Sequence, residues 1–274
     1  MSATRGGDWP ATPGRLAALA AFAAAAVLLV SAERWLPGGL AWVVALACVW
    51  RDRDAAFRRR LGVLLGLVAL LAAAPIQTDL SARNFLHLGA FFLVAVVAPA
   101  LILSRTDPGL LDFRLLPRRP RWRDAVYVLV SIPLVWGVIG LYFFHWNPEL
   151  PTHWWMPAAP DRGWTWRLIA GINAVGIWDE LFFVNTVYAI LRSVYPRRLA
   201  NLGQAVLYTA VLNDMAFTGW GPLLVFAFAV TQGAMYEGSR SLFWVLIVHL
   251  IVDFFLVAAI LHHYYGSLPT RLIL

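Results

Sequence analysis

The sequence predicts an all-α fold, a polytopic membrane helix bundle of about eight or nine transmembrane helices with its N-terminus inside the cell. Of its 274 residues, 61% are hydrophobic and 14% are charged. Soluble domains carry about a quarter charged residues. Long apolar runs recur as far as the C-terminus, and basic residues gather in the short segments between them. This pattern excludes an ordinary water-soluble globular protein.

Nine apolar segments are candidates for membrane spans, because a hydrocarbon core of about 30 Å requires roughly 20 apolar residues per helix. The second and third are short and could lie at the membrane surface, which leaves eight spans as an alternative. Because apolar runs continue along the whole chain, we expect the first segment to be an anchor and not a cleaved signal peptide. The segments are 15–31, 36–50, 61–75, 85–104, 124–145, 167–191, 199–217, 220–236 and 242–263.

The arginines predict the orientation. All 22 basic residues are arginine, and with the N-terminus inside, 17 of them fall on the cytoplasmic side and five outside. This is the positive-inside bias of membrane proteins. It favours membrane lipid as the partner of the basic residues and argues against nucleic acid. We expect a multi-pass protein of the bacterial inner membrane, with the tryptophan-rich outer loop 146–166 on the membrane surface.

The composition changes near residue 123. The first four predicted helices are rich in Ala, Leu and Val and hold few ionisable groups, whereas acids, amides and histidine appear inside the predicted spans from about residue 167 onward. We therefore predict two parts. Residues 1–123 form about four N-terminal anchor helices, and residues 124–274 form a helical core that carries a polar site.

Three polar segments interrupt the apolar helices of this core: Asp179-Glu180, Asn213-Asp214, and His249 with Asp253. An ionisable group inside a bilayer costs roughly 2.5 to 3.5 kcal/mol on the insertion scale, so such groups indicate a functional site. Together they supply acids, an amide and an imidazole, which suffice for activating water and stabilising an oxyanion. Packing and hydrogen bonding between helices are the structural alternative.

Helical geometry predicts how these groups are directed. Adjacent helical residues point about 100° apart, so Asp179 and Glu180 are not expected to face the same partner directly. One of them would address a reaction centre while a neighbouring helix holds the other. His249 and Asp253 are four residues apart, so they share one helical face.

In their order and spacing, these segments resemble the motifs of the CPBP family of membrane proteins, which includes the CAAX proteases and the bacteriocin-processing (Abi) proteins. The resemblance covers about residues 167–260. In that family an acidic pair opens Glu-Glu-x-x-x-Arg, a second helix carries Phe-x-x-x-His, and the last carries His-x-x-x-Asn or Asp. Asp179-Glu180 is similar to the acidic pair and His249-x-x-x-Asp253 to the last motif. The chain departs from the family at Val184, in place of the arginine, and at Asn213, aligned with the middle histidine.

The resemblance implies hydrolysis of a peptide bond within the membrane, in a membrane-associated or lipidated substrate. Asp179 would hold the attacking water with support from Glu180, Asn213 or Asp214 would orient it, and His249 with Asp253 would polarise the carbonyl. These are the predicted catalytic residues: Asp179, Glu180, Asn213, His249 and Asp253.

Three functions stay open at this point. The first is an intramembrane peptidase, an enzyme. The second is a catalytically silent relative that binds a membrane partner as an immunity or chaperone protein, which the changes at Val184 and Asn213 favour. The third is a small proton-coupled carrier that uses the same acids as a relay. We expect no cofactor, with a divalent metal bound by the acids and His249 as the alternative.

Overall fold

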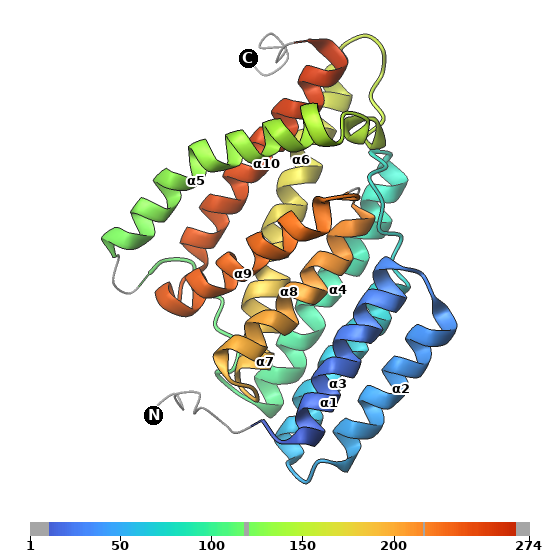
Figure 1. Ribbon diagram of the computed structural model, residues 1–274, viewed down its shortest axis with the longest axis vertical. Helices are drawn as coiled ribbons and strands as arrows, with labels where there is room; N and C mark the ends of the chain where they lie inside the picture. Colours follow the sequence, from blue (N-terminus) through green and yellow to red (C-terminus); the bar gives the residue numbers. More distant parts are fainter. Residues whose placement is uncertain (1–10, 118–120, 216, 267–274) are drawn as a thin grey trace.

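The computed structural model describes residues 11–117, 121–215 and 217–266, except for the side chain of Asp214. This part of the chain is helical and contains no strand (Figure 1). Three helices carry π-helical turns, and a short 3-10 turn lies between α5 and α6. The elements are α1 (Pro13–Ala26), η1 (Val27–Ser31), α2 (Trp35–Arg51), α3 (Ala55–Ala72), α4 (Ala82–Thr106), α5 (Trp122–Leu141), η2 (Tyr142–Trp146), η3 (Leu150–His153), α6 (Arg162–Asp179), η4 (Glu180–Tyr188), α7 (Ala189–Arg192), α8 (Arg197–Asp214), α9 (Gly221–Ser239) and α10 (Leu242–Tyr265).

The predicted all-α polytopic bundle is confirmed, and each of the nine predicted spans has a helical counterpart among the described residues. Five segments are long and apolar enough to cross a membrane by length and composition: Pro13–Ser31, Ala82–Thr106, Trp122–Trp146, Arg162–Arg192 and Leu242–Tyr265. Helices α2, α3, α8 and α9 do not meet that standard. Helix α2 is short, α3 and α8 carry arginines in their first two turns, and α9 carries polar residues in its second half.

Local sequence signals explain where several helices begin. A side-chain oxygen just before the first turn accepts a backbone N–H that has no partner within the helix. Asp54 does so for α3, Ser81 for α4 and Asp161 for α6, and Ser241 accepts from Phe243 at the start of α10. Helix α10 therefore starts at a fixed residue, which sets the height of the His249 side chain in the bundle.

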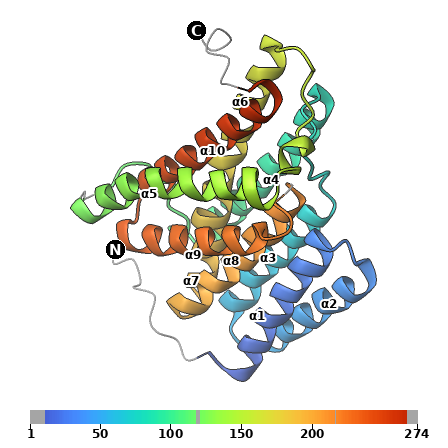
Figure 2. The same ribbon diagram turned by 45° about the horizontal axis from the view of Figure 1, so that its top comes forward.

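The helices form two neighbouring groups that share α8 and the α6–η4 helix (Figures 1 and 2). Helices α1, α2 and α3 pack against one another, and α1 also contacts α8. On the other side α10 packs against α5, α6 and α9. Helices from both predicted parts of the chain thus lie together, while the predicted boundary near residue 123 stays a prediction.

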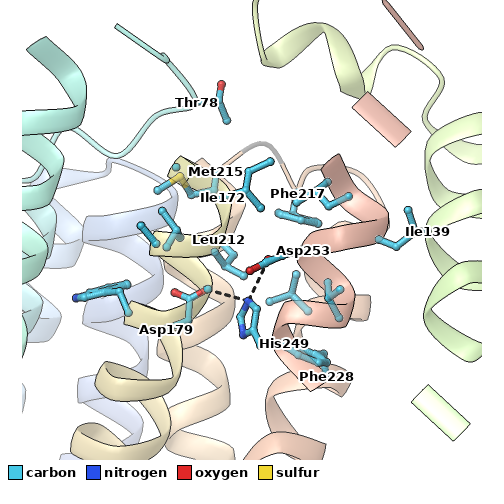
Figure 3. Close-up of a pocket in the computed structure, with 18 of the residues that line it drawn as sticks. Thr78, Ile139, Ile172, Asp179, Leu212, Met215, Phe217, Phe228, His249 and Asp253 are labelled. Carbon is cyan, nitrogen blue, oxygen red and sulfur yellow. Dashed lines mark ion pairs between the residues drawn. The ribbon is translucent and has the colours of Figure 1, made fainter. Parts of the chain in front are cut away.

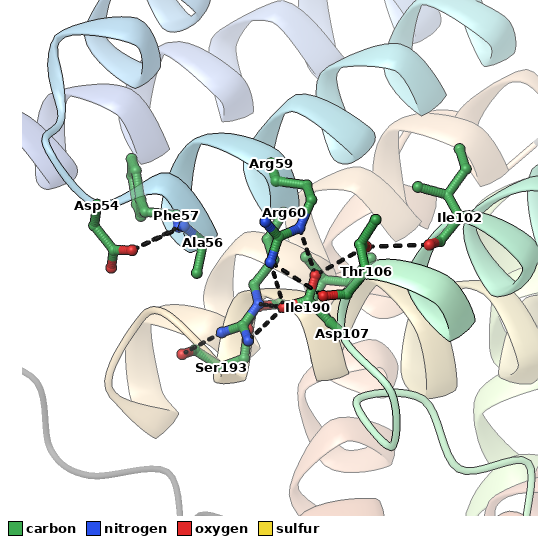
Figure 4. A network of polar contacts seen from close by, with 10 residues as sticks. All are labelled: Asp54, Ala56, Phe57, Arg59, Arg60, Ile102, Thr106, Asp107, Ile190 and Ser193. Atoms are coloured by element: carbon green, nitrogen blue, oxygen red, sulfur yellow. Dashed lines mark hydrogen bonds and ion pairs between the residues drawn. The ribbon is translucent and has the colours of Figure 1, made fainter.

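Arginines gather at one end of the bundle, in the α2–α3, α4–α5, α7–α8 and α9–α10 connections, and we call it the arginine-rich end. Asp107, just after α4, accepts from Arg59 Nε at 2.7 Å and from Arg60 Nη2 at 2.8 Å (Figure 4). The hydrogen bond from Arg59, with help from Arg60, lowers the pKa of Asp107 to about 2. This network joins α3 to the end of α4.

Candidate active site

A cavity of about 620 Å³ lies among α4, α5, α6, α8, α9 and α10 (Figure 3). This volume is within the range of ligand-binding pockets. Its wall is mainly apolar and follows one face of α5 and the start of η2 from Tyr127 to Tyr142, a length of about 22 Å at the rise of an α-helix. Three of the predicted catalytic side chains, Asp179, His249 and Asp253, line it. The cavity is therefore a lipid-like space with a few ionisable groups on its wall.

The imidazole of His249 lies at the centre of the ionisable groups. Its Nδ1 is 2.7 Å from Glu180 Oε1, and its Nε2 is 3.6 Å from both Asp179 Oδ2 and Asp253 Oδ1. A direct N–H···O hydrogen bond measures about 2.7 to 3.2 Å. Glu180 therefore fixes the ring through Nδ1, whereas Nε2 is flanked by two carboxylates and is not bonded directly to either.

The two adjacent acids address the same partner, so the prediction that they could not do so was wrong. Glu180 reaches Nδ1 of His249 while Asp179 approaches Nε2. An imidazole has a nitrogen on each of two edges, so side chains that diverge around a helix can meet one ring. The helix also changes at Glu180 from α to π, a deviation that often occurs at functional sites.

Glu180 is completely buried and lies behind the cavity wall, held by neighbouring helices. Gln232 Nε2 on α9 donates to Glu180 Oε1 at 2.9 Å and also to the Val245 carbonyl of α10 at 2.9 Å. The hydroxyl of Tyr208 on α8 lies 3.2 Å from His249 Nδ1. One of the two acids, Glu180, is thus held by a neighbouring helix, as expected, and the role of Asp179 at a reaction centre stays a prediction.

Gly176 permits the close packing of α6 against α10. A Cβ at this position would overlap the carboxylate of Asp253 and would lie 2.8 Å from His249 Cδ2. Any larger residue would push these two side chains away from Asp179. The glycine therefore sets the distance between the acidic pair of α6 and the His-Asp pair of α10.

Asn213 is not brought to this cluster. Its side chain is half-buried, and the cavity-lining residues of α8 are Leu212 and Met215. Tyr208, Leu212 and Met215 follow one face of the helix, and Asn213 is turned about 100° from Leu212. The Asp214 side chain lies outside the described residues. Of the predicted catalytic residues, the structure thus brings together Asp179, Glu180, His249 and Asp253.

Sequence reasoning missed three residues of the site: Gly176, Tyr208 and Gln232. A glutamine within an apolar helix is a recognisable signal, because a polar group in hydrocarbon needs a partner. Tyr208 could have been found by listing the residues of α8 that share one helical face, because it lies one turn before Leu212. Nothing in the sequence distinguishes Gly176 from the other helical glycines.

Several polar atoms of the site have no hydrogen-bond partner among the described residues, although they are buried. They are Asp179 Oδ1, Glu180 Oε2, Asp253 Oδ2 and Gln232 Oε1. Buried polar atoms are nearly always paired, and each exception calls for an explanation such as a bound water or a catalytic role. Within the same part of the chain, no group of three or more His, Cys, Asp or Glu side chains is arranged to hold a metal ion.

The comparison with known protein families agrees with this geometry. Residues 161–255 match the family model described as type II CAAX prenyl endopeptidase Rce1-like, which confirms the resemblance drawn from the sequence. No curated protein and no solved structure gave a significant match to the chain. The matched segment contains Asp179, Glu180, His249 and Asp253, and it covers helices α6 to α9 with most of α10. This part of the chain is therefore similar to the Rce1-like family of CPBP membrane proteins.

Proposed function

We propose that this protein is an intramembrane endopeptidase that hydrolyses a peptide bond of a membrane-associated or lipidated substrate. The observation that carries the proposal is the arrangement around His249 Nε2, where Asp179 and Asp253 each approach to 3.6 Å on the wall of an apolar cavity. The match to a protease family supports the same reaction class.

In this proposal Asp179 is the general base. Its Oδ1 has no protein partner and lies at the cavity, where it would accept a proton from water while that water attacks the substrate carbonyl carbon. The proton moves from water to the carboxylate, and the new C–O bond leaves an oxyanion on the substrate. The oxyanion would then re-form the carbonyl as the C–N bond breaks, and the same carboxyl would give its proton to the departing amine.

His249 would stabilise the oxyanion. In this proposal Glu180 accepts from Nδ1–H, 2.7 Å away, and so fixes the ring, and Nε2–H is the donor toward the cavity that His249 lines. Preorganised donors of this kind contribute most where water is excluded. Asp253 would keep Nε2 protonated and directed, and Gln232 would hold Glu180 in place. The proposed steps use these side chains and water.

The surroundings support an apolar, membrane-anchored substrate. The cavity wall is mostly Leu, Val, Ile and aromatic side chains. Several wall residues of α4 and α5 are also exposed on the outside of the bundle, among them Leu93 at 64% and Leu134 at 62%. In a membrane these side chains contact lipid, so a hydrocarbon chain would meet the same surroundings inside the cavity as outside. We place the protein in the inner membrane of a bacterial cell.

A catalytically silent relative is the second candidate, favoured by two specific observations. The residue of α8 that meets His249 is Tyr208, and Val184, where the family has an arginine, is completely buried among apolar side chains. Such a protein would bind a membrane partner in the cavity without cutting it. The carrier alternative has no comparable support from the site.

Cleavage of fluorogenic membrane peptides by the purified protein in lipid nanodiscs tests the proposal. Wild type is expected to cut at least one peptide of the set, and Glu180→Gln and His249→Ala are expected to abolish cleavage while keeping the helical content and elution volume of wild type. Asn173→Ala is the matched control, because Asn173 bonds only within α6. If well-folded wild type cuts no peptide and binds one with micromolar affinity, the silent relative replaces the enzyme.

A further inference from the structure

The cavity is polar at one end. Gln77, Thr78 and Asp79 in the α3–α4 connection, with Asn84 on the first turn of α4, line it there, and we call these four residues the polar mouth. Gln77 and Asp79 are exposed, and Thr78 donates to the His153 carbonyl of the α5–α6 loop. In Figure 3, Thr78 stands at the opposite end of the view from His249. Water can therefore reach the cavity at the polar mouth.

The ionisable groups lie away from this mouth. Along α6 the lining residues run from Gly171 to Asp179, and along α10 they run from Leu256 back to Val248. Asp179 on α6 and His249 on α10 thus lie at the ends of these two rows of lining residues that are farther from the polar mouth. Behind them Glu180, Gln232 and Tyr208 are fully buried and close the bundle toward the arginine-rich end.

None of the described residues in the four arginine-rich connections lines the cavity. Toward that end the last polar lining groups are Tyr127 and Thr231, and Tyr127 donates to Thr231 Oγ1 at 2.8 Å. These hydroxyls satisfy each other, as groups next to hydrocarbon must. Their neighbour Val130 is 55% exposed on the flank of α5. Because Val130 lies in a segment apolar enough to cross a membrane, this exposed flank would face lipid there.

The positive-inside bias puts the arginine-rich end in the cytoplasm, so the polar mouth lies on the opposite face of the membrane. The other connections at the mouth agree with this orientation. Trp154 of the tryptophan-rich loop and Met215 and Phe217 of the α8–α9 connection line the same end of the cavity. Tryptophans are typical of a membrane–water interface.

We propose that the substrate of this site is presented from the outer, non-cytoplasmic side: a peptide chain whose apolar anchor stays in the outer leaflet and whose scissile segment enters through the polar mouth. That the bound peptide is a substrate rests on the proposed hydrolysis. The access route rests on the lining residues and on the distribution of the arginines. The anchor would lie along the exposed apolar flank of α4 and α5, and the peptide would reach Asp179 and His249 from the mouth.

Cysteine accessibility in sealed bacterial spheroplasts tests this route. The single cysteine is first removed by Cys48→Ala. Leu212→Cys and Val252→Cys then place reporters on the cavity wall near the ionisable groups. Trp155→Cys in the outer loop and Arg198→Cys at the start of α8 are exposed controls for the two faces. The probe is a small positively charged methanethiosulfonate that does not cross membranes.

We expect external probe to modify Trp155→Cys and at least one cavity reporter in sealed spheroplasts, and to modify Arg198→Cys only after permeabilisation, with rates that differ by about tenfold or more. Cavity reporters that react only after permeabilisation, or from neither side, would overturn the proposal, and so would external labelling of Arg198→Cys. Cysteine labelling does not require catalytic turnover. If the cavity reporters are labelled from outside but the protein cleaves no peptide, the proposed hydrolysis is contradicted and the proposed access route is supported.

Discussion

Two of the carboxylate clusters in this molecule differ in how completely their oxygens are paired. At the arginine-rich end, Asp107 accepts from Arg59, Arg60 and Thr106, and both of its oxygens have partners. In the centre of the bundle, Asp179, Glu180 and Asp253 surround one imidazole, and each keeps a buried oxygen without a protein partner.

The difference separates a structural cluster from a chemical one. A fully paired carboxylate contributes to stability, and it has no free lone pair within the protein for a reacting water. A carboxylate with an unpaired oxygen in an apolar cavity costs free energy, and that cost is expected where the oxygen takes part in a reaction. The predictions below test whether function follows this division.

Asp179→Asn should give the largest effect on activity. The amide keeps the shape of the side chain but removes the base, so we expect the cleavage rate to fall about a thousandfold, within the range for general-base catalysis. Initial rates on a fluorogenic membrane peptide measure the change. Asn173→Ala on the same helix should stay within about twofold of wild type, and an Asp179→Asn variant that keeps a tenth of the activity would remove Asp179 from the mechanism.

Gly176→Ala should lower the rate about a hundredfold, because the added methyl displaces the Asp253 carboxylate and His249. Displacements of about 1 Å commonly have effects of this size. Gly66→Ala is the matched control, since a Cβ at Gly66 meets no atom within 4 Å. Unchanged kcat in a folded Gly176→Ala protein would show that the spacing of α6 and α10 does not limit the reaction.

Gln232→Leu should have a smaller effect, about tenfold, because Gln232 acts through Glu180 and His249 and does not touch the cavity. Loss of its hydrogen bond should lower kcat, leave KM nearly unchanged and shift the pH profile of kcat. Measurement of kcat and KM from pH 5 to 9 separates this positioning role from a packing role. A change confined to KM or to thermal stability would contradict it.

Asp107→Asn should have the least effect on activity, less than about twofold, while lowering the free energy of unfolding by about 1 to 2 kcal/mol, as expected for loss of charged hydrogen bonds. The two arginines lower the folded-state pKa of Asp107 to about 2 from its ordinary value of 3.8. Its contribution to stability is therefore full above about pH 4 and is lost as the pH falls toward 2.

Thermal melts of wild type and Asp107→Asn between pH 2 and 6 measure this contribution. The two melting temperatures should differ at pH 6 and converge near pH 2. A variant that melts like wild type at every pH would show that the Asp107 network does not stabilise the protein. A strong loss of cleavage in Asp107→Asn would contradict the assignment of this cluster to structure and not to chemistry.

Much of the fold could be predicted because a bilayer imposes simple requirements. Apolar length predicted the helical class, since it follows from one strong physical constraint. The orientation drawn from the arginines stays a prediction. The site was predictable where polar residues stand alone in apolar helices, as with His249 and Asp253. The features of the site that the sequence did not predict depend on how the helices pack against one another. Asn213 was aligned by sequence order although its face of α8 turns away, and Gly176 matters only because α10 approaches it.

Hydrolysis in water enriched in ¹⁸O tests the central claim most directly, because it follows the atom that Asp179 is proposed to activate. With wild type, mass spectrometry of the peptide product should show one ¹⁸O in the newly formed carboxyl terminus, and Asp179→Asn should form no such product above background. Labelled product from Asp179→Asn at the wild-type rate would contradict the account, because another group would then be activating the water.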